Sequence, residues 1–287
     1  MTRFGLPPGS IVVGVDGSED AGRAVTWAAV QAALERRVLA LVRSTDQLAL
    51  RDTAWLDAQG IDHRQLVAAL RAAAQDSLAA AATRAAVVAP GIEVVTALVA
   101  DDPRITLTDL SAEAQLVVLG SRGRGPVRST LLGSVGTSVA RHARCPVVVC
   151  RPPAVVAATP VGVVVGADGS GHSVPVLEFA FAQASLRQAP LTVMHCFKQP
   201  DAVDGAESRR PLAQTVADLT EKFPDVEVTT ELTRGLVDEC LADRSPAAGL
   251  LVIGGSADTG RARFLHASCA VAVLERARTA VAVVPEP

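Results

Sequence analysis

An internal duplication constrains the fold of this chain more than any other feature. The segment IVVGVDGS at residues 11–18 returns as VVVGADGS at residues 163–170, so Asp168 is the counterpart of Asp16. A second pair of matching segments, LVVLG at 116–120 and LLVIG at 250–254, has a smaller spacing, so the second copy is shorter in its middle. Two copies in 287 residues give two domains of ordinary size. We expect the domains at residues 1–152 and 160–287, joined by a proline-containing linker at 152–160.

Each copy alternates short β-branched runs with longer helical segments. In the first copy, the apolar residues Val25, Ala28, Ala29 and Ala32 follow helical spacing. The copies close with the runs VVVC at 147–150 and VAVV at 281–284. The resulting order, β-α-β-α-β-α-β-α-β, predicts a parallel sheet covered by helices on both faces. The predicted fold class is therefore α/β, with a five-stranded parallel sheet in each copy.

Composition excludes several classes of function. The formal net charge of −3 argues against a general nucleic-acid binder, which would normally be strongly basic. The longest uncharged run, residues 152–167, contains three prolines and is shorter than the ~20 apolar residues of a membrane-spanning helix. The five cysteines are odd in number and show no C-x-x-C spacing, which favours a reduced, cytoplasmic protein.

Known catalytic motifs are missing from the sequence. The first half has no lysine and the chain has no G-x4-G-K-[ST] motif, so a P-loop is excluded. Neither G-x-S-x-G nor H-E-x-x-H occurs, and the five histidines are scattered without the spacing of metal ligands. We therefore predict no catalytic residue and no metal site.

The segment LGSRGRGPVRSTLLGS at residues 119–134 carries the chemical signal. Gly120, Gly123, Gly133 and Ser134 follow the spacing G-x2-G-x9-G-S. Glycines let backbone N–H groups approach an anion closely, and a helix that begins near Ser134 adds partial positive charge. We expect Ser134 to cap this helix. The turn that contains Asp16 lies at the same carboxyl edge of the sheet, so its carboxylate would meet a ribose or base amine while the loop holds phosphates. This arrangement favours a nucleotide.

These residues resemble the universal stress protein family in its tandem two-domain form. The resemblance also includes VGVDGS at 13–18 and HARCPVVV at 142–149, and it covers almost the whole chain. It implies a Rossmann-like fold of the adenine nucleotide alpha hydrolase type that binds ATP, alone or with Mg²⁺, without a Walker motif. The implied site has Gly14, Val15 and Asp16 beside the nucleoside, the backbone of Ser44 just past the second strand beside adenine, and Leu119, Gly120, Gly123, Gly133, Ser134, Val135 and Gly136 around the ribose and phosphates.

The second copy departs from this pattern in its phosphate loop. It keeps Asp168, Gly254 and Ser268, but it has Ala257 and Ala267 where the first copy has glycines. Alanine at such positions would bar a left-handed backbone or crowd a phosphate. The loop arginines are also lost: Arg122, Arg124 and Arg128 correspond to Ser256, Asp258 and Ala262. We expect the second site to bind ATP weakly or not at all.

The sequence thus predicts an ATP-binding regulatory or sensor protein of a stress or dormancy response, with nucleotide held mainly in the first domain. Two other classes stay open: a slow Mg²⁺-dependent ATPase and a nucleotide-free dimeric scaffold. The resemblance also implies that Val147–Cys150 pairs antiparallel with Val281–Val284, which would cover two exposed sheet edges. The expected partners are an adenine nucleotide, a second copy in a homodimer and an unidentified protein, with no nucleic acid and no membrane.

Overall fold

The computed structural model describes residues 4–45, 63–123, 132–152, 162–197, 204–255 and 261–285. The chain divides into two compact units, residues 1–129 with 133–145, and residues 130–132 with 146–287. The last strand of the first repeat, β5 (Val147–Cys150), therefore belongs to the second unit. Residues 153–160 of the expected linker lie outside the described part of the chain.

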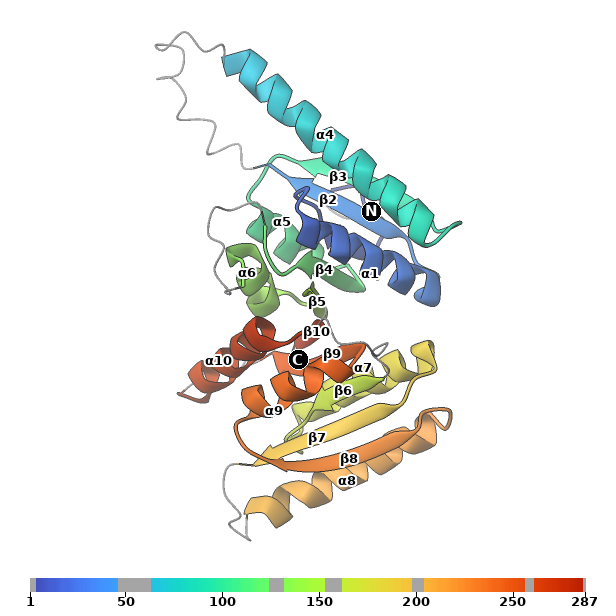
Figure 1. The fold of residues 1–287 in the computed structure, drawn as a ribbon, viewed down its shortest axis with the longest axis vertical. Coiled ribbons are helices and arrows are strands. Elements are labelled where there is room, and N and C mark those ends of the chain that lie inside the picture. The colour runs from blue at the N-terminus through green and yellow to red at the C-terminus, as the bar shows by residue number, and fades with distance from the viewer. Residues whose placement is uncertain are drawn as a thin grey trace. The chain divides into compact units, whose positions relative to one another are not determined.

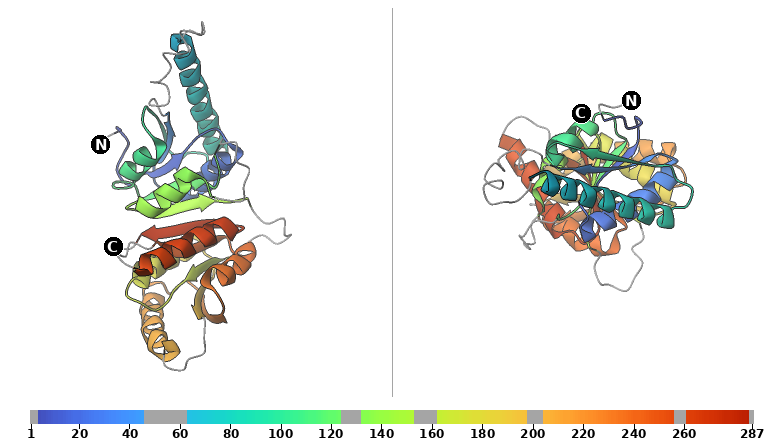
Figure 2. Two further views of the ribbon diagram at one scale, coloured as in Figure 1. Left: turned by 90° about the vertical axis from the view of Figure 1, so that its left-hand side faces the viewer. Right: turned by 90° about the horizontal axis from the view of Figure 1, so that it is seen from above.

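The first unit is a parallel sheet with the strand order β3-β2-β1-β4. The chain moves outward from β1 to β3 and then returns to β4, so right-handed crossovers place α1 and α4 on one face of the sheet and α5 and α6 on the other. Helix α1 packs with α4, and α5 packs with α6 (Figure 1 and Figure 2). The elements are β1 (Ile11–Gly14), α1 (Glu19–Glu35), β2 (Leu39–Ser44), α4 (His63–Val88), β3 (Val94–Val99), α5 (Pro103–Leu110), β4 (Leu116–Gly120) and α6 (Ser134–His142).

The second unit repeats this arrangement, with the strand order β5-β10-β9-β6-β7-β8. Helix α7 packs with α8, and α9 packs with α10. Its elements after β5 are β6 (Val163–Gly166), α7 (Ser173–Arg187), β7 (Leu191–Phe197), α8 (Asp204–Lys222), β8 (Val228–Arg234), α9 (Val237–Arg244), a 3₁₀ turn (Ser245–Ala247), β9 (Leu250–Gly255), α10 (Arg261–Arg276) and β10 (Ala280–Pro285). The α/β fold class predicted from the sequence is confirmed.

Equivalent strands pair in the same register in the two units. Ile11 pairs with Leu39 on one side and Leu116 on the other. Val163, the counterpart of Ile11 in the second copy, pairs with Leu191 and Leu250 in the same way. The alignment of the two copies therefore applies to the strand ladders, and residues of the two units can be compared position by position.

The closing strands pair as expected. In the second unit, β10 runs antiparallel to β5, with Val281 opposite Val149 and Val283 opposite Val147. All four residues of β5 are buried, so their backbone groups are removed from water by this pairing. The predicted antiparallel contact is confirmed, and it protects the edge that β10 would otherwise expose.

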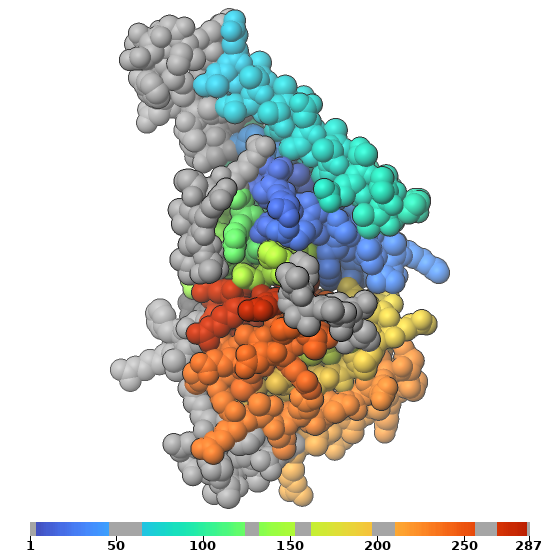
Figure 3. All heavy atoms as spheres, in the orientation of Figure 1, coloured from blue at the N-terminus to red at the C-terminus, as the bar shows by residue number. Residues whose placement is uncertain are grey.

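Helix α4 packs on the first sheet through a face made mostly of alanine. Its buried residues form one stripe at helical spacing, Ala74, Leu78, Ala81 and Ala85. The helix packs on β2 and β3, and its other residues form part of the surface in Figure 3. Among the helices that the structure describes, none is long and apolar enough to cross a membrane.

Candidate functional site

The turn after β1 fixes the carboxylate of Asp16. Asp16 Oδ1 accepts a hydrogen bond from the backbone N–H of Ser18 at 2.9 Å, and Ser18 Oγ caps α1 by accepting from the N–H of Ala21 at 3.1 Å. These two local bonds hold a half-buried carboxylate at the carboxyl end of β1, beside the start of a helix. Val15, the preceding residue, is buried beneath the turn.

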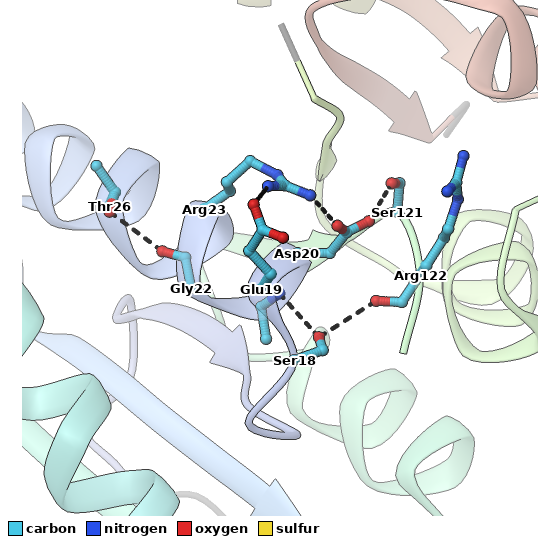
Figure 4. Close-up of polar contacts among 9 residues, drawn as sticks. Ser18, Glu19, Asp20, Gly22, Arg23, Thr26, Ser121 and Arg122 are labelled. Carbon is cyan, nitrogen blue, oxygen red and sulfur yellow. Dashed lines mark hydrogen bonds and ion pairs between the residues drawn. The ribbon is translucent and has the colours of Figure 1, made fainter. Parts of the chain in front are cut away.

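The loop after β4 returns to this turn. Ser18 Oγ lies 3.4 Å from the carbonyl oxygen of Arg122, to which it donates, as Figure 4 shows. A Cβ atom on Gly123 would lie 2.8 Å from Asp16 Oδ2. A Cβ on Gly120 would lie only 2.6 Å from a backbone carbon of Asp20 in α1. The structure therefore brings Gly123 against the Asp16 turn and Gly120, at the end of β4, against the start of α1.

The reason these glycines are needed differs from the expectation. The sequence offers a left-handed backbone as one of two reasons for Gly123 and Gly133, but Gly123 has no positive φ, and φ at Gly133 is −62°. That alternative does not apply. At Gly120 and Gly123 the constraint is the absence of a side chain, because the loop approaches α1 and its preceding turn too closely for a Cβ. Gly133 has no such restriction, since its nearest neighbour would be 3.6 Å from a Cβ.

Helix α6 starts beside the same loop. Gly133 is its N-cap, and the N–H of Gly133 donates to the carbonyl oxygen of Ser121 at 3.0 Å. The sequence predicts Ser134 as the cap, but Ser134 is the first helical residue. The carbonyl of Gly133 already accepts the first helical bond, from Thr137 at 3.0 Å. The backbone N–H groups of residues 134–136 have no partner within the helix, so they form a donor set suited to an anion.

The other wall of the candidate site is the end of β2. Ser44 is the last residue of β2 rather than a residue beyond it, because β3 extends the ladder to a pair between Ser44 and Val99. Ser44 Oγ donates to the carbonyl oxygen of Asp101 and lies 3.4 Å from Thr106 Oγ1 in α5. Thr106 is fully buried, and sequence reasoning missed it because a lone threonine in a short helix carries no motif.

Close packing below the turn requires Gly14. A Cβ on Gly14 would lie 2.7 Å from a methyl group of Leu119 and 3.3 Å from one of Leu107. Both leucines are buried. Gly14 and Leu119 are therefore part of the floor under the site rather than polar contacts.

Sequence reasoning also missed a buried polar link between α1 and the β4 loop. Asp20 is 7% exposed, accepts a hydrogen bond from Ser121 Oγ at 2.5 Å and is ion-paired with Arg23 (Figure 4). An acidic residue in the first turn of a helix is ordinarily explained by its favourable interaction with the helix dipole. The sequence therefore gives no sign that Asp20 also contacts Ser121. Arg122 follows Ser121, and its Nε is buried without a hydrogen-bond partner among the described residues. Arg124 and Arg128 lie outside the described part.

The second unit has a pocket at the equivalent place. Its volume is about 440 Å³, and its lining includes Asp168 and Gly254. Asp168 Oδ1 accepts from the N–H of Ser170 at 2.9 Å, the same turn that Asp16 makes. It also accepts from Ser173 Oγ at 2.6 Å. Ser173 corresponds to Ala21, so only the second unit has this additional hydroxyl.

The helix that follows the second phosphate loop begins in a different place. Ser268 corresponds to Ser134, the first residue of α6, but α10 begins earlier, at Arg261. The backbone N–H of Ser268 is thus inside a helix, where it donates to the preceding turn. Ala257 and Asp258 lie outside the described part.

All five cysteines lie in the described part and none forms a disulfide. Within that part, no cluster of three His, Cys, Asp or Glu residues is arranged to hold a metal ion.

Comparison with known proteins agrees with this duplicated architecture. The chain matches the universal stress protein family over residues 9–151 and 162–285. Universal stress protein Rv2005c of Mycobacterium tuberculosis is 32% identical over 290 residues, covering 95% of this chain and 96% of that protein. Universal stress protein Rv2623 of the same species is 33% identical over 297 residues, covering 96% of each.

A solved structure extends the likeness to the fold. The crystal structure of a universal stress protein from Archaeoglobus fulgidus covers 96% of each chain with a TM-score of 0.72 and 20% identity. The family match spans both repeats, and the relatives align over nearly their full length. The chain therefore belongs to the universal stress protein family.

Proposed function

We propose that the first unit binds an adenine nucleotide, ATP, between the Asp16 turn and the start of α6. One observation carries this proposal: three features meet at one edge of the sheet. They are a fixed carboxylate, a loop without room for a Cβ at Gly120 and Gly123, and a helix N-terminus whose first N–H groups have no partner within the helix. The carboxylate suits ribose hydroxyls, and the donors suit phosphates. The backbone at Ser44 would border the base. The proposed site consists of the residues that the family resemblance implies: Gly14, Val15, Asp16, Ser44, Leu119, Gly120, Gly123, Gly133, Ser134, Val135 and Gly136.

The second unit is proposed to hold this nucleotide weakly or not at all. Two differences support the asymmetry. The carboxylate of Asp168 already accepts a hydroxyl from Ser173, and α10 offers no free N–H at Ser268. A ligand in the 440 Å³ pocket would therefore lack the anion donors that α6 presents in the first unit.

The proposed role is regulatory: nucleotide binding in the first domain would signal to a protein partner in a stress or dormancy response. The domains at residues 1–152 and 160–287, a cytoplasmic location and a homodimer belong to the same proposal. ATP would bring any Mg²⁺ with its phosphates. A slow ATPase and a nucleotide-free scaffold are the rival functions that the experiment must separate.

Isothermal titration calorimetry with ATP, ADP, AMP and GTP tests the proposal. The protein is first freed of any co-purifying ligand, which is identified by mass spectrometry. Saturable binding of ATP with weaker binding of GTP, with and without Mg²⁺, supports an adenine nucleotide site. Absence of binding by all four nucleotides contradicts it and favours the scaffold. Saturable, Mg²⁺-dependent phosphate release would favour the ATPase.

A further inference from the structure

The duplication reveals a pair of thiols where the first unit has a pair of hydroxyls. In the alignment of the two copies, Ser44 corresponds to Cys196 and Thr106 corresponds to Cys240. In the first unit, the two hydroxyl oxygens lie 3.4 Å apart across the gap between β2 and α5. In the second unit, the same backbone framework carries sulfur at both positions, on β7 and α9.

The local structure brings the two thiols together. The neighbouring Cys240 adds to burial in raising the pKa of Cys196, so the two thiols lie near each other. Cys240 Sγ also lies 3.9 Å from the carbonyl oxygen of Arg234. A Cβ on Gly235 would lie 2.8 Å from that sulfur, and Gly235 has a φ of +151°. Glycine is therefore the residue that fits beside the Cys240 thiol.

The pair lies beside the pocket of the second unit. Cys196 lines the 440 Å³ pocket, and both thiols are half-buried rather than sealed in the core. A third thiol, Cys269 of α10, lines the same pocket. A small oxidant can thus reach Cys196 through the pocket, and the half-buried Cys240, which does not line the pocket, is itself partly exposed.

We propose that Cys196 and Cys240 form a reactive dithiol, which a peroxide oxidises to an intramolecular disulfide at the wall of the second pocket. The bond would tie the carboxyl end of β7 to the first turns of α9. Nothing in this inference depends on nucleotide binding by the first unit.

The reaction balances with hydrogen peroxide as the oxidant. Burial raises the pKa of Cys196 to about 12, so little of that thiol is ionised near neutral pH. Cys240 is therefore assigned the first step: its sulfur attacks a peroxide oxygen and loses its proton, the O–O bond breaks, and a sulfenic acid and water form. The Cys196 sulfur then attacks the sulfenic sulfur, loses its proton and expels water. Two thiols and one peroxide give one disulfide and two waters.

Peptide mapping of the folded full-length chain after peroxide treatment tests the proposal. Trypsin separates Cys196, Cys240 and Cys269 onto three peptides, because an arginine or lysine lies between each pair. The expected product is the Cys196 peptide linked to the Cys240 peptide, with the loss of two hydrogen atoms. No linked peptide, or a linkage to Cys145, Cys150 or Cys269, would overturn the proposal.

The first unit supplies matched variants for this experiment. Cys196→Ser and Cys240→Thr recreate the hydroxyl pair that the same framework already accommodates, so both variants should fold. Each should abolish the disulfide, whereas Cys269→Ser should leave it intact. In Cys196→Ser, a sulfenic-acid trap such as dimedone should label Cys240. Labelling of Cys196 in Cys240→Thr to the same extent would overturn the assigned order.

Discussion

Replacing Asp16 by alanine should weaken ATP binding, whereas replacing Asp168 should not. The two carboxylates make the same structural bond, since each accepts a backbone N–H two residues later at 2.9 Å. The variants Asp16→Ala and Asp168→Ala therefore form a matched pair. Both lose this bond, which contributes about 0.5–1.5 kcal/mol to the free energy of unfolding, and Asp168→Ala also loses the bond that Ser173 Oγ donates.

Ligand affinity separates the two variants. A hydrogen bond between the Asp16 carboxylate and a ribose or base is charge-assisted, and losing it should cost about 1.5–3 kcal/mol of binding free energy. That cost is a rise in Kd of roughly 10- to 150-fold. Asp168 faces the pocket of the other unit, where Ser173 already donates to it, so its loss should leave the Kd for ATP unchanged.

The assay is calorimetric titration of ATP into both variants and the unsubstituted chain, with urea unfolding as the measure of stability. The reasoning predicts that Asp168→Ala loses at least as much unfolding free energy as Asp16→Ala, but that only Asp16→Ala shows a large rise in Kd. Equal Kd values for the two variants would refute it, whichever direction they move. A loss of affinity in Asp168→Ala alone would show that the nucleotide occupies the second unit.

Two further predictions concern stability. Gly120→Ala should lower the free energy of unfolding by about 1–3 kcal/mol, because its Cβ would lie 2.6 Å from the backbone of α1, while the exposed control Gly171→Ala should be neutral; equal urea midpoints would contradict this. Asp102 caps α5, and the side-chain hydrogen bond from Arg104 holds the pKa of its carboxyl below the usual range. Asp102→Ala should therefore cost about 1 kcal/mol, a difference that persists from neutral pH down to about pH 4.5 and is lost as the pH falls through the lowered pKa. A difference that disappears between about pH 7 and 5 in urea titrations would contradict the assignment.

The framework was predictable from the sequence because the two copies repeat the same alternation of strand and helix segments. The matches between IVVG and VVVG, and between LVVLG and LLVIG, reappear as equivalent strand partners of Ile11 and Val163. Alternating apolar runs and helices favour a parallel sheet, and right-handed crossovers leave few topologies. The antiparallel pairing of β5 with β10 followed from the family resemblance.

The detail of the site was harder to predict, because it depends on distances between segments far apart in the chain. Nothing near Gly123 in the sequence shows that a Cβ there would meet Asp16, which follows the first strand. The early start of α10 was also hidden, although Ala267 in place of a glycine favours a continuous helix. The hydrogen bond between Asp20 and Ser121 depends on how α1 packs against the loop after β4. The proximity of Cys196 to Cys240 likewise depends on how β7 and α9 pack.

The number of ATP molecules held by each chain tests the central claim most directly. Native mass spectrometry of the intact protein, titrated with ATP to saturation, counts them without assuming where they bind. The account predicts one ATP per chain, and a clearly lower occupancy of Asp16→Ala at the same ATP concentrations. Two ATP molecules per chain, or an unchanged occupancy of Asp16→Ala, would contradict it.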